Sequence, residues 1–229
     1  MSKELISFYN QTKDSVDHQN GGQTNQRRKI ISQWIPKNSK KILDIGCNDG
    51  SENLEFLRKG LDVYGVDISK EAVRRAIRVG VKARVLDIAT QDIPYPPNTF
   101  DVVIAGEIIE HLIDTDKFLE KIYRVLKPGG KLVVTTPNLA SFGRRLMLLL
   151  GKNPFIETSL KQSVGGSAPV GHIRYFTVKT LEDLLTANKF KIIETTSDNL
   201  SLGFLSSGYL AKIFPSLGWR LITLAKKQK

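Results

Sequence analysis

Residues 44–50 read DIGCNDG and follow the apolar run KIL of residues 41–43. Two glycines four positions apart, directly behind a predicted strand, indicate a loop that closes around a nucleotide. The loop differs from both common phosphate-binding loops. Ser51 and Glu52 follow Gly50 where a P-loop has Lys and Ser/Thr, and G-x-x-x-G stands in place of the G-x-G-x-x-G of a pyrophosphate-binding loop.

The charges of this loop indicate the kind of ligand. Asp44 and Asp49 would repel a pyrophosphate, whereas they suit a ligand with a positive charge or an amine. Asn48 stands where such loops usually have a middle glycine. Because asparagine enters the left-handed region of backbone conformation more readily than most residues, we predict a glycine-like conformation at Asn48 and an intact turn.

Strand-like and helical patterns alternate from residue 41 onward. The predicted strands are residues 41–45, 62–66, 82–86, 100–105, 131–136, 190–196 and 220–225. The predicted helices are residues 51–59, 70–78, 115–126, 140–150 and 178–187, the third ending at the Pro-Gly-Gly of residues 128–130. This alternation predicts a parallel sheet with helices on both faces.

The chain is predicted to form one domain over residues 1–229. Residues 1–40 are expected to form a helical N-terminal cap, broken at the Asn-Gly-Gly of residues 20–22. Residues 41–138 carry the nucleotide-type loop and the regular alternation, and so should form the cofactor-binding core. Residues 139–229 include a loop-rich stretch, 151–169, and are expected to form an acceptor-side insert that also completes the sheet.

The loop resembles the first motif of the class I S-adenosylmethionine-dependent methyltransferases, which usually has glycine where Asn48 stands. Later stretches resemble the other motifs of that family in the right order: VYGVDIS (63–69), LDI (86–88), FDVVIAGEIIEHL (100–112) and RVLKPGGKLVV (124–134). The resemblance covers roughly residues 40–138 and is nearest to the small-molecule and glycan-lipid type, methyltransferase domains 11 and 23. It implies a Rossmann-like α/β fold with a doubly wound, mostly parallel seven-stranded sheet.

The same resemblance implies S-adenosylmethionine as cofactor and S-adenosylhomocysteine as product. Asp67 would hold the ribose hydroxyls and Asp87 the adenine amino group. Asp67 lies 21 positions beyond Gly46, which is the spacing expected of a ribose ligand, although capping of the following helix is an alternative for Asp67 alone. The predicted cofactor-binding residues are Asp44, Gly46, Cys47, Asn48, Gly50, Asp67, Ile68, Asp87, Ile88, Gly106 and Glu107.

Histidines are the candidates for acid–base chemistry. A sulfonium methyl is already activated, so the protein mainly aligns the acceptor, but a hydroxyl acceptor still gains from a general base. His172, which follows the loop-rich stretch, is the first candidate base and His111 the second; a structural, hydrogen-bonded histidine is the alternative. Residues 107–111 also match an E-x-x-E-H pattern with which some quinone-pathway O-methyltransferases hold a divalent metal. One histidine with two carboxylates is a weak metal signature, and no metal site is predicted.

The distribution of charge along the chain indicates the kind of acceptor. The net charge is +11, of which residues 1–40 contribute +4, residues 41–138 contribute −1 and residues 139–229 contribute +8. Arg144, Arg145 and Arg174 are the predicted substrate-binding residues. Basic and apolar side chains together suit a small acidic, glycan-linked or lipid-linked hydroxyl acceptor, and also suit peripheral contact with a membrane surface. An exposed, solvated surface is the alternative reading of the charge.

Other functions remain open at this stage. A nucleic-acid methyltransferase, acting on RNA, fits the charge, but the Asn/Asp-Pro-Pro-aromatic motif of base-amino methylation is replaced by Ala105-Gly106-Glu107. Cys47, the single cysteine, lies in the cofactor loop, which excludes base methylation by cysteine attack. A non-catalytic cofactor-binding partner protein is a further alternative, since a fold does not prove catalysis. A nicotinamide oxidoreductase is disfavoured by the missing G-x-G-x-x-G.

The start of the chain, MSKELISFYNQTKD, has no apolar signal-peptide core, and the longest apolar run is residues 146–150. We therefore expect a cytoplasmic protein that can lie at the membrane periphery. One cysteine excludes an intramolecular disulfide and a cysteine-built zinc site. The oligomeric state cannot be predicted from this pattern.

Overall fold

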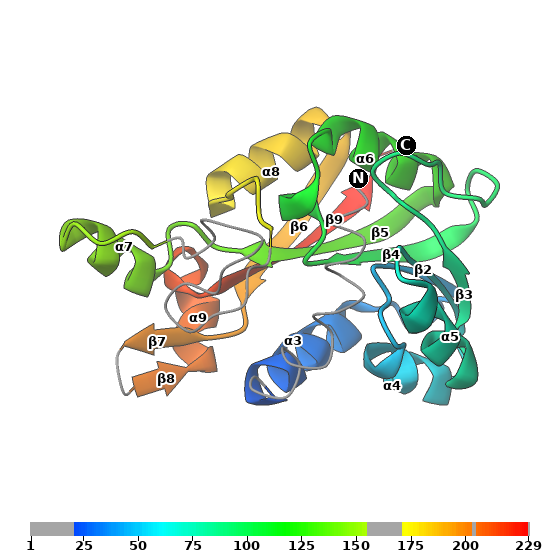
Figure 1. The fold of residues 1–229 in the computed structure, drawn as a ribbon, viewed down its shortest axis with the longest axis horizontal. Helices are drawn as coiled ribbons and strands as arrows, with labels where there is room; N and C mark the ends of the chain where they lie inside the picture. Colours follow the sequence, from blue (N-terminus) through cyan, green and yellow to red (C-terminus); the bar gives the residue numbers. More distant parts are fainter. Residues whose placement is uncertain (1–20, 155–170, 203–204, 229) are drawn as a thin grey trace.

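The computed structural model describes residues 21–154, 171–202 and 205–228. Most of the predicted loop-rich stretch, residues 155–169, and the first half of the predicted N-terminal cap lie outside these ranges. Figure 1 shows a central sheet with helices above and below it. Among the described residues, no helix combines the length and the apolar character needed to span a bilayer.

The sheet has seven strands in the order β3-β2-β1-β4-β5-β9-β6. Their bounds are β1 Lys41–Ile45, β2 Asp62–Asp67, β3 Lys82–Val85, β4 Phe100–Gly106, β5 Leu126–Pro137, β6 Phe190–Ser197 and β9 Arg220–Lys227. Strands β1 to β5 pair in parallel, and β9 is antiparallel to both β5 and β6. The predicted doubly wound, mostly parallel seven-stranded sheet is confirmed. Its strand order reverses between β1 and β4, and ligands of open sheets bind at such a switch point.

Two apolar layers hold helices against the two faces of the sheet. On one face lie α6 (Thr115–Val125) and α8 (Val178–Ala187), whose buried side chains include Phe118, Leu119 and Leu181. On the other face lie α3 (Gly21–Trp34), α4 (Leu54–Arg58) and α5 (Lys70–Arg78). Strand β1 serves both layers, since Leu43 and Ile45 join the first cluster and Ile42 the second. This is the period-2 alternation of a strand buried on both faces.

Helix starts follow from side-chain capping. Ser69 accepts a hydrogen bond from the backbone N–H of Ala72 at the start of α5, and Asp114 accepts one from Lys117 at the start of α6. These bonds satisfy backbone donors that have no partner within the helix. Helix α6 ends at Val125, before the Pro-Gly-Gly of residues 128–130, which lies within β5. Where the sequence predicts a break, at residues 20–22, the structure instead begins helix α3, at Gly21.

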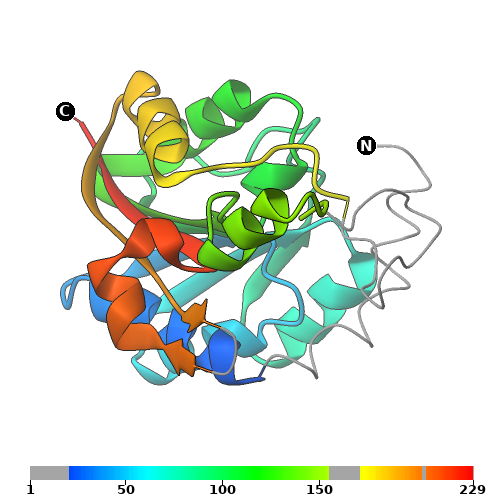
Figure 2. The ribbon, with the colours of Figure 1, turned by 90° about the vertical axis from the view of Figure 1, so that its left-hand side faces the viewer.

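The C-terminal third adds small elements at one end of the sheet. Helix α7 (Phe142–Leu149) follows β5, and β7 (Leu200–Leu202) pairs with β8 (Leu205–Ser207) as a separate two-stranded sheet. Helix α9 (Gly208–Ile213) leads through a 3-10 turn, Pro215–Leu217, into β9. The sequence pattern did not predict β7 or β8. Figure 2 looks directly at this end, with α7 and α9 facing the viewer.

Candidate functional site

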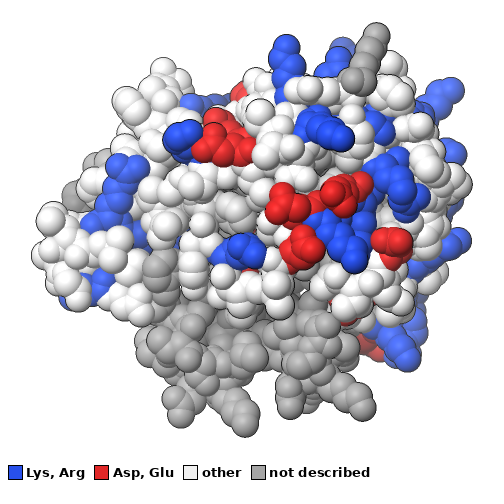
Figure 3. Space-filling model, turned by 90° about the horizontal axis from the view of Figure 1, so that it is seen from above, with Lys and Arg blue, Asp and Glu red and all other residues white. Residues whose placement is uncertain are grey.

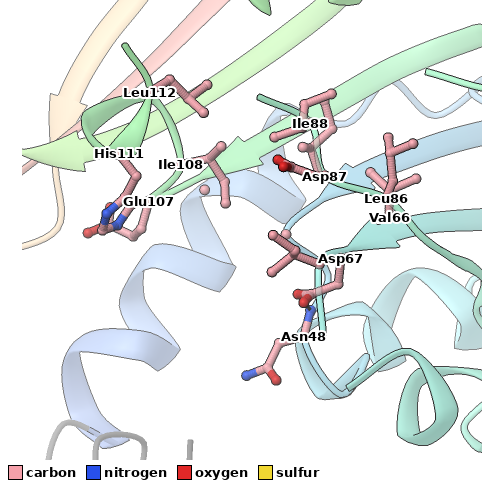
Figure 4. Close-up of a pocket in the computed structure, with 14 residues that line it drawn as sticks. Asn48, Val66, Asp67, Leu86, Asp87, Ile88, Glu107, Ile108, His111 and Leu112 are labelled. Atoms are coloured by element: carbon pink, nitrogen blue, oxygen red, sulfur yellow. Dashed lines mark hydrogen bonds between the residues drawn. The ribbon is translucent and has the colours of Figure 1, made fainter. Parts of the chain in front are cut away.

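A pocket lies at the carboxyl ends of the first four strands, at the predicted switch point (Figure 4). One wall carries Asn48, Asp67 and Asp87, and the opposite wall carries Glu107, Ile108 and His111. The lining residues are Ile45, Gly46, Asn48, Val66, Asp67, Ile68, Leu86, Asp87, Ile88, Gly106, Glu107, Ile108, His111 and Leu112. Predicted residues from four separate motifs therefore share one cavity.

The glycine-type loop has the geometry predicted for it. Asn48 has φ 48°, in the left-handed region, and Gly46 and Gly50 have φ 77° and 78°. The prediction for Asn48 is confirmed. A Cβ at Gly46 would lie 2.4 Å from Cδ1 of Ile108, so the bare glycine backbone is what allows the loop and the exit of β4 to approach each other. Both conditions favour glycine at position 46.

Asp67 ends β2 and is buried. Its Oδ2 accepts a hydrogen bond from the backbone N–H of Asn48 at 3.0 Å, and its Oδ1 accepts one from Ser69 at 2.8 Å. These bonds fix the carboxylate and also tie the left-handed residue of the loop to the second strand. A carboxylate has about four lone-pair positions, so each oxygen can still accept from a ribose hydroxyl.

Asp87 follows β3 and is held in a turn. Its Oδ1 accepts from the backbone N–H of Ala89 at 3.0 Å, and its Oδ2 accepts from the Thr90 hydroxyl at 3.0 Å. Leu86 and Ile88 flank it and contribute apolar surface to the pocket. An acid fixed between apolar side chains is suited to a flat heterocycle with an exocyclic amino group.

Three predicted cofactor residues, Asp44, Cys47 and Gly50, are not among the pocket-lining residues and act behind the loop. Asp44 accepts a hydrogen bond from Nδ2 of Asn53 at 2.6 Å, and burial raises its pKa from 3.8 to about 7. The buried side chain of Cys47 packs against Gly65, where a Cβ would lie 2.6 Å from Sγ. The side chains of Asp44 and Cys47 thus support the loop from the side away from the pocket. Contact of these three residues with the cofactor stays a prediction.

Glu107 has a strained backbone, with φ 55°, at the exit of β4. Its Oε1 accepts a hydrogen bond from the Thr135 hydroxyl at 2.8 Å and lies 3.1 Å from Nε of Arg220. Burial alone would raise the pKa of Glu107, but the positive charges of Arg220 and Arg27 and the Thr135 bond outweigh it, so the pKa is lowered. Glu107 is therefore a fixed anion at the pocket wall.

The two candidate bases meet next to Glu110, in a short turn after β4. The ring centroids of His111 and His172 are 4.8 Å apart, and Nε2 of His172 lies 3.8 Å from Oε1 of Glu110. The carbonyl of Glu110 accepts backbone hydrogen bonds from Ile173 and Arg174, which fasten the segment of His172 to this turn. Residues far apart in sequence thus form one cluster beside the pocket.

Glu110 is the acid of this cluster. Its side chain has 1% exposure, and its Oε2 accepts from the Thr136 hydroxyl at 3.1 Å. Burial, with a further contribution from the negative charge of Glu107, raises the pKa of Glu110 well above its ordinary value. A buried acid with a raised pKa beside an imidazole is an arrangement suited to proton transfer.

The three charged or titratable residues of the E-x-x-E-H pattern, Glu107, Glu110 and His111, do not all meet at one site. Glu110, His111 and His172 offer ligand atoms within 4.8 Å of one another, but Glu107 is turned toward Arg220 and Thr135. Two imidazoles and one carboxylate are donors that suit a divalent transition metal better than magnesium. The absence of a metal site stays a prediction.

The three predicted substrate arginines hydrogen-bond to backbone carbonyls. Arg174 donates to Leu112 and Ile113, and Arg145 donates to Ala140 and Ser216. Both of these side chains are exposed, so their remaining donors face solvent. Arg144 differs because it is buried.

Arg144 donates to the carbonyl of Asn138 and lies over the Trp219 ring. These contacts show Arg144 in a packing position.

Several residues around the pocket were missed by the sequence analysis. Arg220 and Asp198 form a buried ion pair of 2.5 Å behind Glu107, and Arg27 of α3 forms an ion pair with Glu52 close to the loop. No sequence motif marks these residues. Only the approach of β9, β6 and α3 to the exit of β4 brings their charges to the pocket.

Comparison with known proteins agrees with this geometry. The sequence model of the family described as "Methyltransferase domain" matches residues 17–195. The human mitochondrial ubiquinone biosynthesis O-methyltransferase is 29% identical over 164 residues, which are 66% of this chain and 42% of that protein. The chain spans about half or less of the length of the curated relatives it matches.

Solved structures share the fold. A protein from Pyrococcus horikoshii superposes with a TM-score of 0.68 at 20% identity, with 100% of both chains covered. The 1,6-didemethyltoxoflavin-N1-methyltransferase of Burkholderia thailandensis, solved with S-adenosylhomocysteine, superposes with a TM-score of 0.64 at 17% identity, covering 99% of this chain and 88% of that one. The chain therefore belongs to the methyltransferase-domain family, with the class I fold and with S-adenosylmethionine as the cofactor that the family uses.

Proposed function

We propose that the chain transfers a methyl group from S-adenosylmethionine to a hydroxyl of a small acceptor that carries both an anionic and an apolar part. A lipid-linked or glycan-linked acceptor has this chemistry. The cofactor supplies an activated sulfonium methyl group. Matches to O-methyltransferases that act in ubiquinone biosynthesis support a hydroxyl acceptor over an amine.

The pocket fits the cofactor by its donor set. Asp67 offers fixed carboxylate oxygens for two ribose hydroxyls, and Asp87 offers an acceptor for the adenine amino group. Gly46 leaves the loop backbone open, since any side chain there would collide with Ile108.

We assign the general base to His172, and the observation that carries this assignment is its distance of 3.8 Å from the buried carboxyl of Glu110. In this scheme the acceptor hydroxyl gives its proton to a ring nitrogen of His172. The buried carboxyl of Glu110 lies beside the imidazole of His172, so Glu110 acts as a positioning residue and not as the base. His111 lines the pocket and packs on His172, so this contact restricts the orientation of the His172 imidazole beside the pocket.

The anionic part of the acceptor is assigned to Arg174 and Arg145, which are exposed and keep unfilled donor positions. Arg144 is left out because it is buried against Trp219. Apolar side chains beside Arg174, namely Ile113, Ile173 and Tyr175, are exposed and can receive the apolar part. The two features select against a neutral polar metabolite.

The proposal is tested by a methyl-transfer screen with radiolabelled cofactor and four acceptor classes. The classes are a prenylated phenol carrying a carboxylate or phosphate, the same phenol without the anionic group, a neutral polyol and RNA. We expect transfer to the first class, loss of most activity in His172→Ala, and a raised KM in Arg174→Gln with less effect in Arg174→Lys. Preference for the polyol, or transfer to RNA with both variants active, contradicts the proposal.

A further inference from the structure

Helix α7 exposes its apolar side chains and buries a cationic one, the reverse of an ordinary surface helix. Its bounds are Phe142–Leu149, and its single buried side chain is that of Arg144. Leu149 is 82% exposed, and most of the other large apolar side chains on and just after this helix are exposed too. These side chains are Phe142, Leu146, Leu148, Leu149 and Leu150. A helix that only covers a core would place its leucines inward and its arginine outward.

The inversion is fixed by specific contacts. The buried guanidinium of Arg144 donates to the carbonyl of Asn138 and lies 5.0 Å over the Trp219 ring. Arg145 donates to the carbonyls of Ala140 and Ser216. Both arginines thus tie α7 to the chain before it and to residues 216–219, and the helix cannot roll its leucines inward without breaking these bonds.

A second exposed apolar group lies at the same end of the molecule. Tyr209, Ile213 and Phe214, on and after α9, are exposed, and so is Trp219. Figures 1 and 2 show α7 and α9 projecting at this end, beyond the main sheet. We call the surface formed by these exposed side chains of residues 142–150 and 209–219 the apolar end.

In the described segments that carry the apolar end, residues 139–154 and 205–228, every charged side chain is basic. Lys152 and Lys212 are exposed next to the leucines and to Ile213. Residues 139–156 and 199–229 contain no Asp or Glu. In Figure 3 the end that carries α7 shows white and blue surface, whereas acidic and basic groups are mixed over the rest of that face.

We propose that the apolar end docks the protein on the surface of an anionic lipid bilayer, with the leucines of α7 in the headgroup region. Exposed leucines with flanking lysines and without acids are the composition of an interfacial helix, and the lysines complement anionic headgroups. A purely apolar groove on a protein partner would leave the lysines without a complement. The inference does not depend on which acceptor is methylated.

The test is co-sedimentation of the full chain with vesicles of phosphatidylcholine alone and of phosphatidylcholine mixed with phosphatidylglycerol. The wild type is expected to sediment with the mixed vesicles. Leu149→Ser and Leu150→Ser should each weaken binding about tenfold, since each removes a leucine from the apolar surface that enters the bilayer. Lys152→Gln with Lys212→Gln should weaken binding to mixed vesicles only, and added salt should do the same to the wild type.

The matched control is Ile77→Ser, which removes an apolar side chain of 54% exposure from α5, away from this end. It should bind vesicles like the wild type. Calorimetric binding of S-adenosylmethionine, unchanged in every variant, shows that the variants are folded. Wild type that stays in the supernatant with all vesicles overturns the proposal, and so do leucine variants that bind normally. Loss of self-association in the leucine variants without vesicle binding would instead assign the surface to a second copy of the chain.

Discussion

His172 and Glu110 face each other across 3.8 Å, between Nε2 and Oε1, although His172 lies in the acceptor-side insert and Glu110 in the turn after β4. The carboxyl is buried and the imidazole has 11% exposure. Backbone bonds from Ile173 and Arg174 to the carbonyl of Glu110 hold the two segments together. The proposed base therefore lies beside a buried acid.

The first prediction concerns this pair. His172→Ala should lower kcat by about 10²-fold or more, the usual contribution of a general base. Glu110→Gln should lower kcat less and leave the KM for the acceptor unchanged, because the amide keeps the size of the side chain but cannot exchange a proton with the imidazole 3.8 Å away. Glu120→Gln, on the exposed side of α6, is the control and should leave both kcat and KM unchanged. A Glu110→Gln variant with the kcat of the wild type would assign Glu110 a packing function only.

The second prediction concerns Asp67. Asp67→Ala should weaken binding of S-adenosylmethionine by about 1.5–3 kcal/mol, the range for hydrogen bonds to a charged group. Isothermal titration calorimetry measures the change. Asp62→Ala, at the start of the same strand, removes an exposed carboxylate that pairs with Lys82 and should leave the affinity unaltered. Equal affinity in the wild type and in Asp67→Ala would remove Asp67 from the cofactor site.

The third prediction concerns Asn48 in its left-handed conformation, with φ 48°. Asn48→Gly should bind the cofactor as well as the wild type, since glycine adopts this conformation without strain. Asn48→Val should bind it poorly, since a β-branched residue at positive φ is an outlier. Both affinities come from the same titration, with thermal unfolding to confirm that each variant folds. Normal binding by the valine variant would show that the loop does not need this conformation.

The fourth prediction separates backbone strain from collision. Gly46 and Gly60 have nearly the same φ, 77° and 76°, but a Cβ at Gly46 would lie 2.4 Å from Ile108 and one at Gly60 would meet nothing within 4 Å. Gly46→Ala should abolish detectable cofactor binding, whereas Gly60→Ala should cost only the strain of about 1–2 kcal/mol in unfolding free energy. Comparable losses of binding in both variants would show that strain alone decides.

The fifth prediction concerns Asp44 and pH. Burial raises its pKa from 3.8 to about 7, so the folded state binds its proton more tightly than the unfolded state does. Stability from this group is present below pH 4 and is lost as pH rises to about 7. The Asp44→Asn side chain does not ionise, so the variant does not lose this stability as pH rises. Its free energy of unfolding at pH 8 should exceed that of the wild type by about 4 kcal/mol at most. Urea unfolding of both proteins at pH 5 and pH 8 measures the free energies of unfolding. The same pH dependence of stability in the wild type and in the variant would contradict the prediction.

Much of the fold could be predicted because local pattern and global fold agree. The continuous apolar residues 100–105 predicted a strand buried on both faces, and β4 is that strand. The predicted helix 70–78 matches α5, since its N-cap residue Ser69 and its apolar stripe are both local signals. Strands β7 and β8 were missed because three-residue strands give no readable alternation.

Positions on the cofactor side could also be predicted. Gly46, Asn48, Asp67 and Asp87 each follow a predicted strand, and parallel strands bring their carboxyl ends to one edge. Pocket contact was harder to predict for residues of the same motif. Asp44 and Cys47 lie within two positions of Gly46, but their side chains contact Asn53 and Gly65 and do not line the pocket.

The sequence by itself determined the class of fold, the loop conformation and the family, because these depend on periodicity and on residues close together in the chain. Tertiary structure alone decided which charges meet. Arg220 reaches Glu107, His172 reaches Glu110, and Arg144 turns inward while the leucines of α7 face outward. Such pairings join residues from distant segments, and they depend on how β9, the acceptor-side segment and α7 pack after the sheet has formed. No spacing within one segment encodes that outcome, since the energy of each pair exists only when both partners have been brought together.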